Sequence, residues 1–266
     1  MKLTSIASGS SGNCTLISGN TTDILVDAGI SCKRIKESLE ALGVVPERLG
    51  ALLITHEHSD HVCGLFIFEK RFHVPIYAPQ ETLDEIRRLD KKGEIDPELM
   101  HPVTTDEWFS VGDLSILAFN NLHDAACPVA YRVECEDKAV AVCTDLGNYT
   151  GYTVRNLLGL DALLIESNHD LNMLQVGPYP YQLKRRVMSD YGHLSNERCG
   201  QLLCEIANPR LKYALLGHLS QENNIPQLAL DTVRTELKDG MEPSLAQQIY
   251  ILVAKRDEMT ETIEIR

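Results

Sequence analysis

The chain has 266 residues, close to the upper size limit of a single hydrophobic core, and 44% of them are hydrophobic. Its 38 acidic residues outnumber its 25 basic ones, and the formal charge of -13 argues against broad nonspecific attraction to nucleic acid. The apolar runs are far shorter than the roughly 18 to 20 residues that cross a bilayer. The first residues pass into Gly and Ser before a secretory apolar core forms. These features predict a cytoplasmic protein without membrane segments.

Short apolar or β-branched stretches alternate with segments of helical periodicity, which is the pattern of an α/β protein. Strands are predicted at 3–7, 14–18, 23–29, 50–56, 74–79, 114–121, 129–135, 138–145, 161–166, 213–218 and 248–254. Helices are predicted at 32–43, 81–92, 153–159 and 195–207, the first of them ending at Gly43. No Pro/Ser-rich linker divides this series, so we expect one domain spanning 1–266.

The most informative stretch is "ITHEHSDH", where an apolar strand is followed by four possible metal ligands. These ligands are His56, His58, Asp60 and His61. Where a strand turns into a loop, several side chains can converge on one point beyond the sheet edge. Imidazole nitrogen and carboxylate oxygen together suit zinc, manganese or iron. The motif therefore predicts a metal site at the end of this strand.

The segment Thr55–His61 resembles the HxHxDH signature of the metallo-β-lactamase fold, a four-layer αβ/βα sandwich with a metal pair between its sheets. The resemblance implies further ligands after later strands, and His123, Asp145 and His218 each follow one. It implies two divalent ions per chain, zinc or manganese. One ion would be held by His56, His58 and His123, the other by Asp60, His61 and His218, with Asp145 bridging both.

A finer resemblance extends over essentially the whole chain. It is carried by "SGSSGN" at 8–13, "HDA" at 123–125, "CTDLG" at 143–147, "IESNHD" at 165–170, "GHLSN" at 192–196 and "GHLSQENN" at 217–224. Together these blocks resemble the YycJ (WalJ) family, which implies a 5′-to-3′ DNA exonuclease with DNA as its partner and substrate. The segment 146–217 is too short for the β-CASP domain that RNase J inserts there, so we expect no such insertion.

A metal pair lowers the pKa of a shared water and stabilises the oxygens of an in-line displacement, so hydrolysis by a metal-bridging hydroxide is expected. Asp60 would orient this hydroxide or accept its proton. The Gly/Ser loop at 8–13 can cradle a phosphate, with Ser10 and Asn13 as donors, although such a loop is equally typical of a plain turn. His193, when protonated, would bind the scissile phosphate or protonate the leaving oxygen.

The tetrapeptide Gly-His-Leu-Ser occurs twice, and the two copies are assigned different roles. The second copy supplies the ligand His218, whereas the first directs His193 toward substrate. Ser195 and Asn196 would add neutral donors beside His193, and Ser195 also stands where a helix N-cap belongs. The basic run Lys184–Arg186, just upstream, is the charged cluster expected on the substrate path.

Glu166 ends a strand and is predicted to steer a metal ligand or His193, and His169 would extend this supporting group. A purely structural role is the alternative for both residues. The whole chain also leaves an alternative function open, a small-molecule hydrolase of the same fold such as a cyclic phosphodiesterase or lactonase, which the -13 charge favours. The choice of DNA or RNA, the end polarity, the metal and the oligomeric state are not decided by the sequence.

Overall fold

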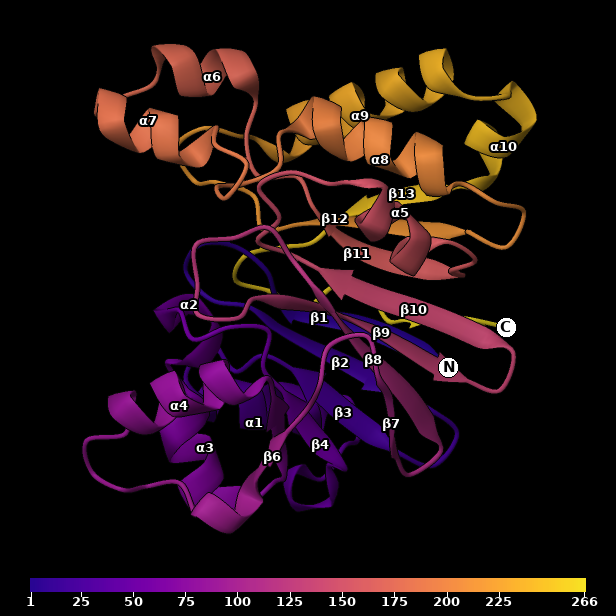
Figure 1. The fold of residues 1–266 in the computed structure, drawn as a ribbon. Helices are drawn as coiled ribbons and strands as arrows, with labels where there is room; N and C mark the ends of the chain where they lie inside the picture. Colours follow the sequence, from indigo (N-terminus) through magenta and orange to yellow (C-terminus); the bar gives the residue numbers. More distant parts are fainter.

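The computed structural model of the protein describes residues 1–266. Two seven-stranded sheets face each other across the molecule (Figure 1). In order across the first sheet, the strands are β14 (Ile263–Glu264), β1 (Lys2–Ala7), β2 (Cys14–Ser18), β3 (Asp23–Val26), β4 (Ala51–Leu53), β5 (Ile76–Ala78) and β6 (Met100–Pro102). Across the second sheet they are β13 (Tyr250–Val253), β12 (Tyr213–Gly217), β11 (Ala162–Glu166), β10 (Lys138–Cys143), β9 (Val129–Cys135), β8 (Leu114–Asn120) and β7 (Trp108–Val111).

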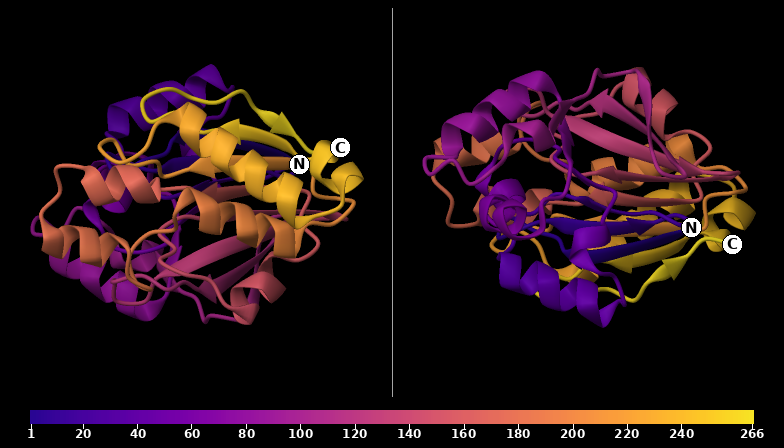
Figure 2. Two further views of the ribbon diagram at one scale, coloured as in Figure 1. Left: turned by 90° about the horizontal axis from the view of Figure 1, so that it is seen from above. Right: turned by 90° about the horizontal axis from the view of Figure 1, so that it is seen from below.

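Helices lie outside the pair of sheets, so that the sheets are enclosed between helical layers (Figure 1, Figure 2). Beside the first sheet are α1 (Cys32–Ala41), α2 (Ser59–Val62), α3 (Leu65–Phe72), α4 (Gln80–Leu89) and the 3₁₀ turns η1 (Pro46–Arg48) and η2 (Pro97–Leu99). Beside the second are α5 (Gly151–Leu157), α6 (Leu171–Val176), α7 (Tyr181–Val187), α8 (Asn196–Ile206), α9 (Pro226–Gly240) and α10 (Pro243–Gln248). None of these helices has the length and hydropathy needed to cross a bilayer. The layers confirm the four-layer αβ/βα sandwich expected from the sequence.

The two sheets share one of the hydrophobic cores. Ile24 and Leu53 from the first sheet are fully buried in the same cluster as Val140 from the second. Tyr131 lies in this cluster, and its hydroxyl donates to the backbone oxygen of Ile54 at 3.0 Å, which ties the sheets together through a buried polar contact. The chain end joins the first sheet, because β14 pairs antiparallel with β1.

The predicted strands and helices are all present, with some ends displaced. The strand predicted at 50–56 is hydrogen-bonded as a strand only over Ala51–Leu53, and the helix predicted at 81–92 ends at Leu89. That helix stops early because Asp90 accepts hydrogen bonds from the following backbone and closes a turn. Gly43 follows α1 with a φ of 76°, as a helix-ending glycine does. The segment 146–217 contains only α5 to α8, β11 and β12, so the β-CASP insertion is absent.

Several strands end at the same edge of the sandwich and project polar residues there. β10, β11 and β12 are parallel neighbours in one sheet, and β3 and β4 are parallel neighbours in the other. Three residues just beyond these ends adopt positive φ: Asp27 (63°), Asp145 (55°) and His218 (53°). This left-handed conformation is costly for residues other than glycine, and it is found where surrounding structure enforces a functional geometry. The sharp turns aim all three side chains inward.

Candidate metal centre

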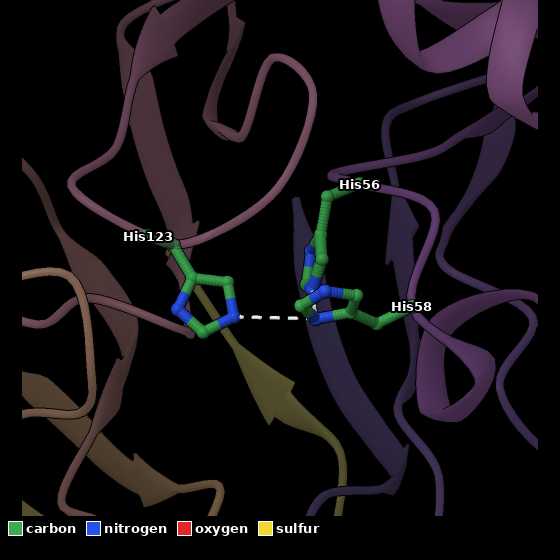
Figure 3. A group of neighbouring side chains, drawn as sticks. All are labelled: His56, His58 and His123. Carbon is green, nitrogen blue, oxygen red and sulfur yellow. Dashed lines mark hydrogen bonds between the residues drawn. The ribbon is translucent and has the colours of Figure 1, made fainter. Parts of the chain in front are cut away.

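Three histidines form the first of three groups that could hold a metal ion, and the third group, Asp145, Glu166, His193 and His218, shares two residues with the second. His56 and His58 come from the loop after β4, whereas His123 follows β8 of the other sheet and faces them across the gap (Figure 3). The distance from His56 Nε2 to His58 Nδ1 is 3.1 Å, and the distance from His123 Nε2 to His58 Nδ1 is 3.3 Å. One nitrogen of each ring thus converges on a common point.

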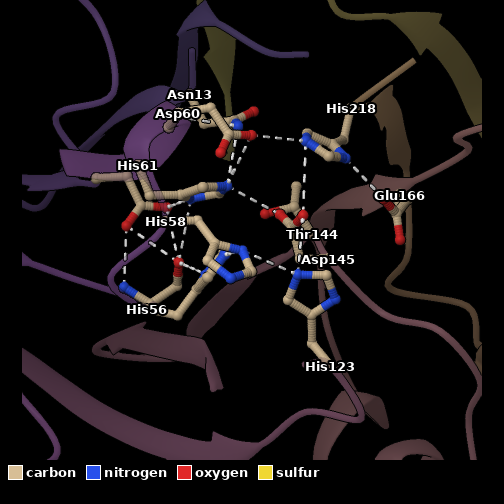
Figure 4. Close-up of polar contacts among 12 residues, drawn as sticks. Asn13, His56, His58, Asp60, His61, His123, Thr144, Asp145, Glu166 and His218 are labelled. Carbon is tan, nitrogen blue, oxygen red and sulfur yellow. Dashed lines mark hydrogen bonds and ion pairs between the residues drawn. The ribbon is translucent and has the colours of Figure 1, made fainter. Parts of the chain in front are cut away.

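The second cluster contains Asp60, His61, Asp145 and His218 (Figure 4). His61 Nε2 lies 3.0 Å from Asp145 Oδ2, and His218 Nε2 lies 3.3 Å from Asp60 Oδ2. The other oxygen of Asp145, Oδ1, is 3.7 Å from Nε2 of His123 in the first cluster. Asp145 therefore stands between the clusters, as the bridging position predicted for it requires.

The outward nitrogens of these rings, except that of His58, are held by the protein. Nδ1 of His61 donates to Asp27 Oδ2 at 2.7 Å, and Nδ1 of His123 donates to the backbone oxygen of Gly192 at 3.1 Å. Nδ1 of His56 donates to the hydroxyl of Thr55, whose own hydrogen is directed at Asp27. A ring that donates through Nδ1 presents the lone pair of Nε2 to the interior. This is how proteins orient metal-binding imidazoles.

The nitrogen and oxygen atoms that face the interior of the centre are better partners for divalent cations than for one another. Lone pairs of facing imidazole nitrogens approach to about hydrogen-bond distance, and Asp145 Oδ2 is buried without a hydrogen-bond partner. Burial would raise the pKa of Asp145, but the interactions with His218 and His61 outweigh it and hold this pKa well below its usual range. A buried carboxylate among inward-facing imidazoles is a donor set for zinc or manganese. The clusters can bind metal.

Glu166 anchors the histidines of both Gly-His-Leu-Ser copies. Its Oε1 accepts from Nδ1 of His193 at 2.9 Å and from Nδ1 of His218 at 2.7 Å. Its Oε2 accepts from the backbone of Leu146 and Leu194, so the fully buried carboxylate has a complete set of partners. Burial raises the pKa of Glu166, but His193 and the hydrogen bonds overcome this and lower it to about 2. Glu166 contacts a predicted ligand and His193 at once.

His193 lies at the open side of the centre. Its side chain is 22% exposed, whereas that of His218 is 1% exposed. Nδ1 is held by Glu166, and Nε2 has no hydrogen-bond partner in the protein. Burial lowers the pKa of His193, but the charge of Glu166 and the hydrogen bond to it raise this pKa above its usual value. The ring is thus placed to meet a group that arrives from solvent.

The Gly/Ser loop at 8–13 is a closed turn beside the centre. Asn13 is buried, and its Oδ1 accepts from the backbone of Gly9 at 3.0 Å. Its Nδ2 lies 3.0 Å from His61 Nε2, so the side chain supports the loop and a predicted ligand. Ser10 is exposed at the tip of the turn. Of the two predicted donors, only Ser10 therefore faces outward.

Ser195, Asn196 and His169 are turned into the protein. Ser195 is the N-cap of α8 and accepts from the backbone of Arg198, and Asn196 Oδ1 accepts from the hydroxyl of Ser167 at 2.6 Å. Both side chains have internal partners, which replace the substrate contacts predicted for them. His169 is buried with Nδ1 unpartnered, and burial lowers its pKa to about 4. No direct contact joins His169 to the metal-facing atoms.

The sequence interpretation missed residues that support the centre. Asp27 follows the apolar stretch "DILV" just as Asp145 follows "AVAVCT", so the rule that found one would have found the other. Asp124, next to His123, accepts from Arg186 Nε at 2.7 Å, a pairing of distant segments that no local pattern contains. Gly29 is needed for close packing, because a Cβ there would lie 1.7 Å from the backbone oxygen of Asp60.

Comparison with known proteins agrees with this geometry. Residues 22–218 match the model of the beta-lactamase superfamily domain. The chain is 38% identical over 240 residues to exodeoxyribonuclease WalJ of Streptococcus pneumoniae, covering 89% of this chain and 88% of the relative. It is 32% identical over 234 residues to exodeoxyribonuclease YycJ of Bacillus anthracis, covering 88% of each. The metallo-beta-lactamase fold protein YhfI of Bacillus subtilis superposes with a TM-score of 0.72 at 19% identity, over 98% of this chain and 99% of that one.

The fold, the metal-facing clusters and the domain match define a member of the beta-lactamase superfamily. Within this superfamily, the chain belongs to the family of WalJ and YycJ. The membership confirms the resemblance found in the sequence and its interpretation as a metal-dependent hydrolase. The likeness to YhfI supports the fold alone, since the identity is only 19%.

Proposed function

We propose that this protein is a DNA exonuclease that hydrolyses phosphodiester bonds at a centre of two divalent ions. The observation that carries the proposal is the pair of clusters, in which seven side chains from both sheets direct nitrogen and oxygen atoms at two adjoining points. The relatives WalJ and YycJ, both called exodeoxyribonucleases and both similar over nearly nine tenths of the chain, support DNA as the substrate. We propose 5′-to-3′ as the direction of degradation.

The clusters support the following assignment of ligands to two ions. His56, His58 and His123 would hold one ion; Asp60, His61 and His218 would hold the other; Asp145 would serve both. Zinc or manganese suits this mixture of imidazole and carboxylate. When bound, two such ions lower the pKa of water and stabilise the attacking and leaving oxygens at the phosphate.

The protein's own groups would position the reaction. Asp60 has a side chain that is 22% exposed, so one face of its carboxylate is available to orient a water or accept its proton. His193 presents Nε2 outward while Glu166 holds its Nδ1, which keeps the ring fixed and favours its protonated form. We assign to His193 the contact with the scissile phosphate or the transfer of a proton to the leaving 3′-oxygen.

The test is the incubation of purified protein and Mn²⁺ with duplex DNA carrying a label at the 5′ end, beside DNA labelled at the 3′ end. We expect the 5′ label to appear at once as short product, while the 3′ label stays on shortening strands. Asp60→Ala serves as the inactive control and Asp113→Ala, at a distant loop, as the active one. Hydrolysis of simple phosphodiesters or lactones without degradation of DNA would contradict the proposal and favour a small-molecule hydrolase.

A further inference from the structure

An arm of two short helices stands at the edge of the metal centre. It comprises residues 171–191, with α6 and α7, and projects from the second half of the molecule at the upper left of Figure 1. The view from above in Figure 2 shows the same segment reaching out at one side. Its apolar side chains are unusually open to solvent, with Val176 84% exposed and Tyr181 73% exposed. The arm therefore offers a surface that the fold itself does not cover.

Three contacts fasten the end of α7 to the centre. The backbone N–H of His193 donates to Val187 O at 2.9 Å, and the backbone oxygen of Gly192 accepts from the ring of His123. Arg186 Nε donates to Asp124 Oδ2 at 2.7 Å, directly beside His123. The arm is thus continuous with the open side of the centre, where His193 is exposed. His193, at the open side of the centre, therefore lies next to the end of α7.

The exposed face of α7 carries an aromatic ring and an unpaired positive charge. Tyr181 and Arg185 are four residues apart, so they lie on the same face of the helix. Arg185 is exposed and forms no ion pair, whereas Arg186 is paired with Asp124 and Lys184 donates to the backbone oxygen of Gln175. α7 has no acidic residue, although the chain carries a net charge of -13. The positive charge here is local and complements a polyanion.

We propose that this face of α7 binds the single strand that extends from the metal centre, with a base stacked on Tyr181 and a phosphate held by Arg185. The inference rests on the proposed nuclease function and adds the path of the substrate beyond the metal centre. Stacking on an exposed aromatic ring beside a cation is how proteins bind single strands without sequence preference. Arg186 is the positioning residue of this surface, because its ion pair with Asp124 fixes α7 against the centre.

The test compares two double variants of the full-length protein. The arm variant is Tyr181→Ala with Arg185→Ala. The control variant, Tyr250→Ala with Lys212→Ala, removes an exposed tyrosine and an exposed lysine beside Tyr213, where β12 begins, at the opposite end of that strand from His218. Binding is measured by anisotropy with a phosphorothioate oligonucleotide that resists cleavage, and turnover is measured with DNA and with bis(p-nitrophenyl) phosphate.

We expect the arm variant to bind the oligonucleotide roughly tenfold or more weakly, with a shallower dependence on salt, and to raise KM for DNA. Turnover of bis(p-nitrophenyl) phosphate should stay unchanged, and the control variant should match the wild type in every measurement. Unchanged oligonucleotide binding in the arm variant overturns the proposal, and so does an equal loss with both substrates, which indicates damage to the centre. If the arm variant binds anionic lipid vesicles more weakly than the wild type but binds the oligonucleotide equally well, the surface is a membrane-binding surface instead.

Different results would contradict the nuclease function and the binding surface on α7. If the wild-type protein binds the oligonucleotide through this face but degrades no DNA, the nuclease function is wrong and the binding surface stands. If it degrades DNA equally well without Tyr181 and Arg185, the surface is wrong and the nuclease function stands.

Discussion

At the scale of single residues, the two Gly-His-Leu-Ser copies make the same local hydrogen bonds but have different proposed roles. In each copy the histidine donates through Nδ1 to the same oxygen of Glu166. In each copy the serine hydroxyl accepts from the backbone three residues on, Ser195 from Arg198 and Ser220 from Asn223. The difference lies in what Nε2 meets, since only His218 is buried among metal-facing carboxylates. The surroundings, and not the tetrapeptide, set the role.

Replacing either histidine by alanine separates the two roles. We expect His218→Ala to lower the metal content of the purified protein, because a ligand of the second cluster is lost. His193→Ala should keep both metals and slow turnover by about 10²- to 10⁴-fold, the range of a lost general acid. Metal content by mass spectrometry and initial rates on DNA are the measurements. Equal metal loss in the two variants would refute the division, and His73→Ala, at an exposed site, is the control.

Asp27 is expected to control metal affinity without touching the metal. Its Oδ2 accepts from Nδ1 of His61 at 2.7 Å, so Asp27→Asn weakens the contact that orients this ring. Loss of such a partner typically lowers metal affinity 10- to 100-fold. A metal titration followed by activity should therefore show a higher half-saturation concentration with a nearly restored maximal rate. A variant with unchanged metal dependence would show that His61 is oriented by other contacts, such as that with Asn13.

At the scale of elements, the centre depends on how strands end. β3, β10 and β12 are each followed by a residue with positive φ, which bends the chain and turns a side chain back toward the gap between the sheets. Glycine supports the neighbouring loops where backbones touch, as at Gly29 against Asp60. The ligands are therefore held by strand ends and packed loops, which gives them more definite positions than mobile loops would.

α3 contains a buried acid that makes stability depend on pH. Burial raises the pKa of Glu69 from 4.5 to about 8. Because the folded-state pKa lies above the unfolded one, the folded protein holds this proton more tightly, and stability is lost as the pH rises from about 4.5 through 8. Glu69→Gln should therefore stabilise the protein relative to wild type at pH 8.5, on the order of 5 kcal/mol, and little at pH 4.5.

Urea unfolding at the two pH values measures this difference. Glu37→Gln, at an exposed position of α1, is the matched control and should shift neither curve. A gain in stability that is equal at both pH values would mean that Glu69 acts through packing rather than through its proton.

At the scale of the whole molecule, the core between the sheets joins the two halves. Leu53 and Val140 come from different sheets and are both fully buried in it. Neither sheet can retain this burial alone, so we propose that residues 1–266 fold as a single domain. The shared core also fixes the distance between the sheets, and thereby brings His56 and His58 opposite His123.

Unfolding should accordingly be a single transition. We expect Trp108 fluorescence, which reports on β7, and far-UV circular dichroism, which reports on all helices, to give the same midpoint in urea. Leu53→Ala should lower both midpoints together, with a loss of about 2 to 5 kcal/mol in the free energy of unfolding. Two separate midpoints, or a change confined to one probe, would divide the chain into two domains.

Local patterns in the sequence predict the main strands, the α/β class and the candidate metal ligands. Alternating apolar runs and polar residues directly after them are local patterns. His56, His123, Asp145 and His218 each follow a strand end closely, whereas His58, Asp60 and His61 lie further along the loop and short helix after β4. α9 was overlooked although Ala229, Val233 and Leu237 repeat at intervals of four residues after a proline at its start. The spacing of these apolar residues predicts this helix from the sequence alone.

Which side chains meet depends on packing between segments that are distant in the sequence. The pairing of Asp27 with His61, of Asp124 with Arg186 and of Glu166 with two histidines joins residues from 27 to 62 positions apart. Such packing also turns Ser195 and Asn196 inward, because their polar atoms are taken up by α8 and the neighbouring loops once the helix packs. The local sequence specifies which residue types lie at a strand end, whereas long-range packing specifies which residues they contact.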